Sequence, residues 1–136
     1  MILIVCLDDQ NGMMFNRRRQ SMDSCVRERI CAISSRSILW MNEYSAGQFS
    51  QVQPNFRIAE DFLDQAGEGA YCFVENVDVA SVSDRVEGIV IFWWNRRYPA
   101  DMRFPVSSFC DRWRLVDTAE FSGSSHEKIT QEVYML

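Results

Sequence analysis

Two short apolar runs, residues 2–7 and 89–94, restrict the fold of this chain more than any other feature. Neither run alternates with polar residues, and the first is rich in β-branched side chains. Strands of this kind lie inside a parallel sheet, where both faces are covered. Because helical patterns separate the strand candidates along the chain, we expect an α/β fold with a mixed sheet.

The other elements follow from periodicity and turn residues. Residues 21–33 have apolar positions at helical spacing, and Ser21 or Asp23 is suited to cap the start of that helix. A second helix is expected from Arg57 to Ala66, closed by Gly67. The pattern also predicts one or two helical turns within 42–53, a weak helix or irregular crossover at 77–85, strands at 37–41 and 70–74, and an antiparallel pair at 112–120 and 128–134.

Size and charge exclude several classes of partner. A chain of 136 residues, 47% of them hydrophobic, is predicted to form a single domain over residues 1–136. The net charge of −5 argues against binding to nucleic acid or to acidic membranes. No apolar run approaches the roughly 20 residues of a membrane span, and we expect a cytoplasmic protein. The basic run from Arg17 to Arg19 is interpreted as a solvated turn or helix start, with phosphate binding as the alternative.

The cysteine and histidine content argues against disulfides and metal sites. The cysteines are odd in number and scattered, and no two have Cys-x-x-Cys spacing: Cys6, Cys25, Cys31, Cys72 and Cys110. This pattern is typical of reduced thiols in a cytoplasm. A zinc site needs clustered ligands, and His126 is the only histidine. We therefore predict no disulfide and no structural metal.

The last third of the chain resembles the dihydrofolate reductases. Its most specific signals are an Asp-x-x-Phe-Pro turn, formed by Asp101, Phe104 and Pro105, and the pair Ser125 and His126 before the final strand. The resemblance implies a shortened bacterial member of that group. Its fold would be a mixed, mostly parallel sheet with helices on both faces and a C-terminal antiparallel hairpin.

The same resemblance implies positions for the strands and for one functional carboxylate. The strand at 2–7 would lie between those at 89–94 and 70–74. Asp23 matches the carboxylate that grips the substrate in that family, so it is the expected catalytic residue if the chain is a reductase. Its alternative role is a solvent-exposed helix cap. His126 is expected to be structural or exposed, far from the ligand pocket.

Four departures from the family pattern affect cofactor and substrate binding. Asn42 and Glu43 replace the Gly-Arg that starts the phosphate-binding helix, and Glu75 and Asn76 replace a Gly-Gly beside the nicotinamide diphosphate. Carboxylates at such positions repel phosphate. Phe92 replaces a threonine that hydrogen-bonds the substrate, and a phenylalanine cannot donate. The interval 45–58 is too short for the two strands that build the adenosine side of the groove.

These departures lead to three hypotheses about function. The first is a pseudoenzyme that has lost nicotinamide cofactor binding, needs no cofactor, and acts as a small binding or interaction module for a small molecule or a protein. The alternative is a minimal NADPH-dependent reductase of a pterin-like heterocycle, and the third is a homo-oligomer that pairs through an exposed sheet edge. The ligand-pocket candidates are Asn42, Glu43, Ser45, Glu75, Asn76 and Phe92. Of these, the pairs Asn42-Glu43 and Glu75-Asn76 are expected at the carboxyl ends of adjacent strands.

A further association of short chains of this type is with the name ribonuclease Z. A metal-dependent hydrolase of that kind needs a zinc-binding motif rich in histidine and aspartate. The single histidine, His126, gives that activity no support.

Overall fold

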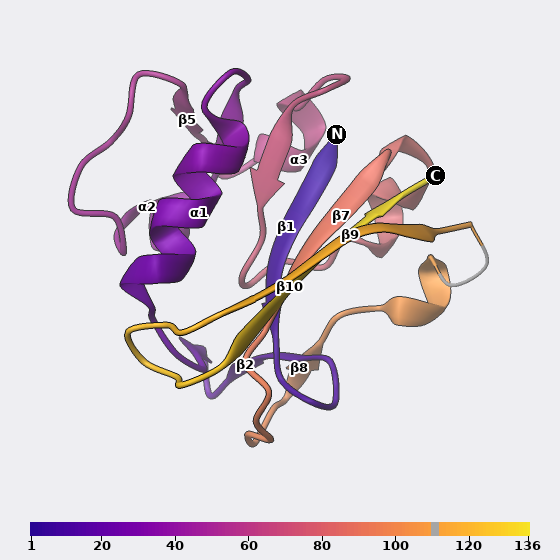
Figure 1. Cartoon of the computed structure of the whole chain (residues 1–136). Helices are drawn as coiled ribbons and strands as arrows, with labels where there is room; N and C mark the ends of the chain where they lie inside the picture. Colours follow the sequence, from indigo (N-terminus) through magenta and orange to yellow (C-terminus); the bar gives the residue numbers. More distant parts are fainter. Residues whose placement is uncertain (110–111) are drawn as a thin grey trace.

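The computed structural model describes residues 1–109 and 112–136 (Figure 1). In chain order the elements are β1 (Ile2–Leu7), β2 (Gly12–Phe15), β3 (Arg18–Arg19), α1 (Ser24–Ser34), β4 (Leu39–Met41), α2 (Glu43–Ala46), β5 (Phe56–Ile58), α3 (Phe62–Gln65), β6 (Tyr71–Phe73), η1 (Ala80–Arg85), β7 (Gly88–Trp93), β8 (Met102–Arg103), η2 (Val106–Ser108), β9 (Arg114–Phe121) and β10 (Ile129–Met135).

A seven-stranded mixed sheet organises the molecule, in the order β5-β4-β6-β1-β7-β10-β9. β1 lies inside it and pairs in parallel with both β6 and β7. β4 and β5 extend the parallel part beyond β6. β10 runs antiparallel to β7, and β9 antiparallel to β10, so the C-terminal hairpin closes one side. The predicted α/β class, the position of the first strand and the hairpin are confirmed.

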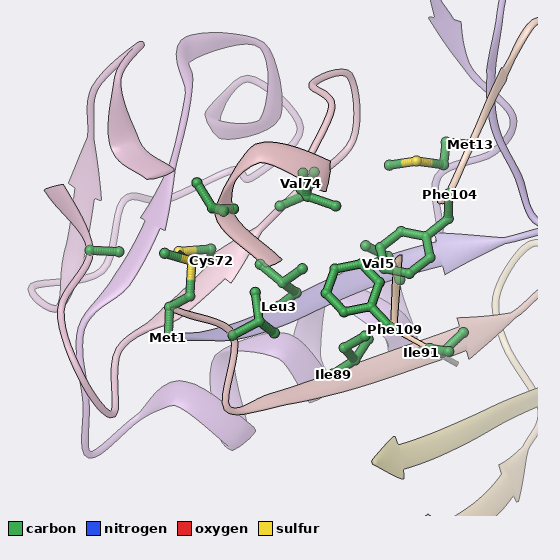
Figure 2. Packing of buried hydrophobic residues seen from close by; sticks show 14 of the residues in the cluster. Met1, Leu3, Val5, Met13, Cys72, Val74, Ile89, Ile91, Phe104 and Phe109 are labelled. Atoms are coloured by element: carbon green, nitrogen blue, oxygen red, sulfur yellow. Dashed lines mark hydrogen bonds between the residues drawn. The ribbon is translucent and has the colours of Figure 1, made fainter. Parts of the chain in front are cut away.

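Alternate side chains of β1 enter two separate cores, one on each face of the sheet. On the first face, Leu3 and Val5 pack in a cluster that includes Phe62 of α3 and Val82 of η1. We call this the η1 face, and Figure 2 shows its packing around β1 and β7. On the other face, the α1 face, Ile4 packs in a cluster with apolar side chains of α1. Burial on both sides explains why the sequence of β1 is apolar throughout.

The second predicted helix begins later than expected. Arg57 and Ile58 lie in β5, where they pair with Trp40 and Met41 of β4, and the helix α3 starts at Phe62. The prediction of a helix from Arg57 was therefore wrong, because pairing to a neighbouring strand outweighs a weak local helical pattern. The interval 45–58 was predicted to be too short for two strands, and the structure has one strand there, β5.

A small second sheet, ordered β3-β2-β8, was missing from the sequence prediction. A turn with positive φ at Asn16 and Arg17 joins β2 to β3, so the basic run forms part of a hairpin. Met14 of β2 also pairs with Met102 of β8, which brings distant parts of the chain together. This small sheet places Arg19 beside the carboxyl ends of the main strands.

Two remaining points concern thiols and membrane spans. The cysteines within the described residues are free thiols, and Cys110 lies outside them. Burial raises the pKa of the Cys72 thiol to about 12. Among the described residues, no helix is both long enough and apolar enough to cross a membrane.

Candidate functional site

The ligand-pocket candidates of β4 and β6 meet where these two strands end. Asn42 follows β4, Asn76 lies shortly after β6, and the Asn42 side-chain amide donates to the Asn76 side-chain oxygen at 2.8 Å. This confirms the expected proximity, since neighbouring parallel strands end at the same edge of the sheet. Such an edge is where open α/β sheets place their ligands.

Two amides at the start of α2, those of Glu43 and Ser45, are already paired. Asn42 caps this four-residue helix, and its side-chain oxygen accepts from the Ser45 amide at 3.1 Å. The Glu43 amide donates to a carboxylate oxygen of Glu60 at 3.0 Å. Helix-start amides attract anions when they are free. Here a carboxylate from the same chain takes that position.

Arg19 crosses from the small sheet to the strand ends and forms a two-pronged ion pair with Glu75. Its Nε lies 2.8 Å from Glu75 Oε2, and its Nη2 lies 3.1 Å from Glu75 Oε1. The guanidinium also donates to the Tyr44 carbonyl at 3.1 Å and lies 4.2 Å from the centre of the Tyr44 ring. Glu75 is only 9% exposed. The sequence argument treated Glu75 as a free negative charge, whereas the structure pairs it with a cation.

Little space remains beneath this ion pair. A cavity lined by Cys6, Arg19 and Glu75, among others, has a volume of about 10 Å³. That is about the space of one water molecule. Gln20 also lines it, and its buried side-chain oxygen has no hydrogen-bond partner within the described residues. Arg19, Tyr44 and Glu75 thus form a closed cluster, which we call the Arg19 clamp.

Asp23 is a buried helix cap whose two carboxylate oxygens are both occupied. Oδ1 accepts from the amides of Cys25 and Val26 at 2.8 and 3.1 Å, which caps α1. Oδ2 accepts from the amide and the hydroxyl of Ser125, both at 2.7 Å. Burial alone raises the pKa of Asp23, but these hydrogen bonds outweigh it and lower the pKa to about 2. Asp23 is 1% exposed, so the expectation of a cap holds but the solvent-exposed setting does not.

His126 continues this network and is not remote from Asp23. Its Nδ1 lies 2.6 Å from Ser125 Oγ, and its Nε2 lies 2.6 Å from the Tyr98 hydroxyl. Since the Ser125 hydroxyl donates to Asp23, it accepts from Nδ1–H, and the Tyr98 hydroxyl then donates to Nε2. Trp94 stacks on the imidazole at 4.8 Å. His126 was expected to be structural or exposed and far from the ligand pocket. None of its hydrogen bonds reaches a ligand-pocket candidate, but it lies near Asp23 because the β9–β10 loop folds back over the start of α1.

Burial lowers the pKa of His126, and nearby Arg96 lowers it further against the opposing effect of Asp23. The ring is therefore neutral near pH 7, in agreement with the hydrogen bonds that it makes. The pair Ser125 and His126 was the only sequence signal for this network.

Phe92 lies apart from the polar cluster. It is fully buried on the α1 face and meets the Phe121 ring edge-on, with ring centres 6.3 Å apart. It contributes packing and offers no hydrogen-bonding group. The structure therefore brings Asn42, Glu43, Glu75 and Asn76 together, and places Phe92 in the core.

A solved structure with the same architecture decides the fold. Dihydrofolate reductase from Enterococcus faecalis, complexed with NADP(H) and RAB-propyl, matches 98% of this chain and 94% of its own, with a TM-score of 0.65 and 13% sequence identity. The chain has a dihydrofolate reductase-like fold. No protein-family model and no curated protein sequence matches the chain. At this level of identity the likeness is one of dihydrofolate reductase-like architecture alone.

Proposed function

We propose that this dihydrofolate reductase-like protein does not use a nicotinamide cofactor and acts as a small binding module. The Arg19 clamp carries the proposal. It joins β3 to the carboxyl ends of β4 and β6, where this type of fold places its ligand, and leaves a cavity of only about 10 Å³. A nicotinamide ring is far larger than one water molecule.

The charges around α2 support the same conclusion. A phosphate at the start of this helix would have to displace the Glu60 carboxylate from the Glu43 amide. Glu43 itself is acidic and lies in the first turn. An anion gains from a helix start through free amides and a positive field. Here the Glu43 and Ser45 amides are paired, and the Glu43 and Glu60 carboxylates oppose a further negative charge. The residues present do not fit a dinucleotide diphosphate.

Opening the clamp would also be costly. Glu75 is nearly buried, and removing Arg19 from it would leave an uncompensated carboxylate. Separating a buried ion pair in this way typically costs about 3–5 kcal/mol. A cofactor that had to displace Arg19 would bind at least about a hundredfold more weakly for that reason alone.

The alternative, a minimal reductase, requires Asp23 to supply a proton. A general acid is most effective when its pKa lies near the working pH. Hydrogen bonds hold the pKa of Asp23 at about 2, and neither oxygen is free to contact a substrate. Asp23 is better suited to fastening the β9–β10 loop to α1.

Calorimetric titration of the full chain with NADPH tests the proposal. We expect no binding heat at cofactor concentrations up to about 1 mM, which corresponds to a binding free energy weaker than about −4 kcal/mol. The double variant R19M/E75Q opens the clamp without leaving an unpaired charge. R17M is the matched control, because Arg17 is an exposed arginine in the same basic run.

Each result has a defined meaning. If the clamp blocks the cleft, NADPH gives no binding heat with the unaltered chain or with R17M. Binding heat would then appear only with R19M/E75Q. Micromolar binding by the unaltered chain that weakens in D23N or N76A would overturn the proposal. The reductase hypothesis would then be the correct one.

A further inference from the structure

A second and larger pocket lies on the η1 face, away from the Arg19 clamp. Its volume is about 250 Å³, and its lining is mainly apolar. Leu7, Ile89 and Ile91 contribute to it from β1 and β7. Figure 2 shows the rings of Phe104 and Phe109 lying over these two strands, close to Ile89 and Ile91.

Aromatic rings form much of the remaining lining. Phe104 and Phe109 stack with centres 5.3 Å apart and planes inclined by 17°. Phe109 in turn contacts Trp113, at a centre distance of 5.7 Å. Flat rings offset by such distances suit a further planar ring, because aromatic faces and edges carry complementary charge. The lining therefore favours a planar aromatic occupant over a flexible aliphatic one.

The large pocket and the small cavity beneath Arg19 have no lining residue in common. Cys6 lines the small cavity beneath Arg19, whereas the next residue, Leu7, lines the large pocket. Successive side chains of a strand point to opposite faces. None of the three residues of the Arg19 clamp lines the large pocket.

The two tryptophans that line this pocket differ in their hydrogen bonding. The Trp93 indole N–H donates to Glu132, which also accepts from the Tyr134 hydroxyl. The Trp113 indole nitrogen is buried, yet no acceptor within the described residues pairs with it. Buried donors are almost always satisfied in native proteins, so an unpaired one needs an explanation. Trp113 lacks an acceptor, and a ligand in the adjoining pocket can supply one.

We infer that the η1-face pocket binds a planar aromatic molecule of one or two fused rings whose hydrogen-bond acceptor pairs with the Trp113 indole N–H. The size agrees, because an apolar cavity of about 150 Å³ is enough to bind benzene. The aromatic lining supplies the stacking faces, and Trp113, which also lines the pocket, supplies the donor. This site goes beyond the proposed loss of cofactor binding and does not depend on it.

Quinoline and naphthalene are matched probes for this site. They share two fused rings, but only quinoline carries a nitrogen that accepts a hydrogen bond. The four tryptophans of the full chain give four indole N–H signals in a nitrogen-correlated NMR spectrum. We expect quinoline to shift the Trp113 signal, with a dissociation constant on the order of 1 mM, and naphthalene to bind about fivefold to tenfold more weakly, the effect of one neutral hydrogen bond.

Two substitutions identify the role of the indole. W113F removes the donor and keeps an aromatic ring, so quinoline should bind as weakly as naphthalene while naphthalene is unaffected. W40F, which removes an indole outside the pocket lining, should leave both affinities unchanged. If W113F does not fold, V106W replaces it, because Val106 lines the pocket yet is 42% exposed. A tryptophan there fills the pocket and should abolish the binding of both probes.

Several outcomes would overturn the inference. One is a Trp113 signal that stays in place at millimolar quinoline. Equal affinity for the two probes, or quinoline binding that persists in V106W, would also refute it. A Trp113 signal that moves when the protein alone is concentrated, without quinoline binding, would identify a second copy of the chain as the occupant. The proposed NADPH titration has no bearing on these results, so the two proposals can fail separately.

Discussion

The substitution D23N tests whether a buried carboxylate fastens the β9–β10 loop to α1. Asparagine keeps the shape of the side chain and one oxygen for the amides of Cys25 and Val26, but it turns an NH₂ group toward the two donors of Ser125. The pKa of Asp23 falls from 3.8 to about 2 on folding. That difference corresponds to roughly 2–3 kcal/mol of carboxylate-specific stability. We expect D23N to lower the free energy of unfolding at pH 7 by about that amount.

The dependence on pH has a defined sign. Because folding lowers the pKa of Asp23, the ionised form stabilises the folded state at pH values above about 5. This contribution is lost as pH falls through 4 toward 2, where the carboxylate becomes protonated in both states. The difference in stability between the unaltered chain and D23N should therefore shrink steadily over this interval.

Urea unfolding followed by tryptophan fluorescence at pH 7, 5 and 3 measures the effect. D9N is the matched control, because Asp9 is exposed and carries the same charge. Its free energy of unfolding should stay within about 0.5 kcal/mol of the unaltered chain. If D23N were as stable as D9N at pH 7, or if its deficit stayed constant down to pH 3, Asp23 would not have the role deduced here.

Two further substitutions or modifications test neighbouring parts of the structure. G123A places a Cβ against the Asp23 carboxylate and the Ile129 side chain. We therefore expect the free energy of unfolding to fall by about 1–3 kcal/mol and the melting temperature to fall with it. An unchanged melting curve would contradict this packing. The Cys72 thiol is buried and has a pKa of about 12. It should therefore resist a thiol reagent at pH 8 until urea unfolds the chain. Peptide mapping that finds Cys72 modified in the native protein would show that the thiol is not buried.

The main sheet could be predicted because the apolar sequences of its central strands indicate burial on both faces. β1 and β7 are covered on both faces, so nearly every side chain in them is apolar. The cap of α1 could also be predicted, because a residue with a short oxygen-bearing side chain, Asp23, directly precedes the helix. β2, β3 and β8 are only two to four residues long, and too short to show a period. The pairing of β2 with β8 also joins residues far apart in the sequence, Met14 and Met102, which no local pattern predicts.

In the candidate site, too, some features could be predicted from the sequence and others depend on distant contacts. The proximity of Asn42 and Asn76 followed from topology, because adjacent parallel strands end together. The partners of Glu75 and Asp23 did not follow, since Arg19 is 56 residues from Glu75 and Ser125 is 102 residues from Asp23. Ion pairs and hydrogen bonds over such separations leave no periodic signal. They nonetheless change the expected electrostatics at Glu75, because this glutamate is paired with an arginine and is not a free negative charge.

The interior position of β1 also has a consequence for the folding of the chain. Ile2 pairs with Tyr71 on one side and with Gly88 on the other, so both neighbours of β1 come from segments far along the sequence. Closing such long loops slows folding, and an unpaired apolar strand is prone to aggregation in the meantime. The sheet therefore cannot form by adding strands in the order of the sequence, because β1 needs β6 and β7 on its two sides.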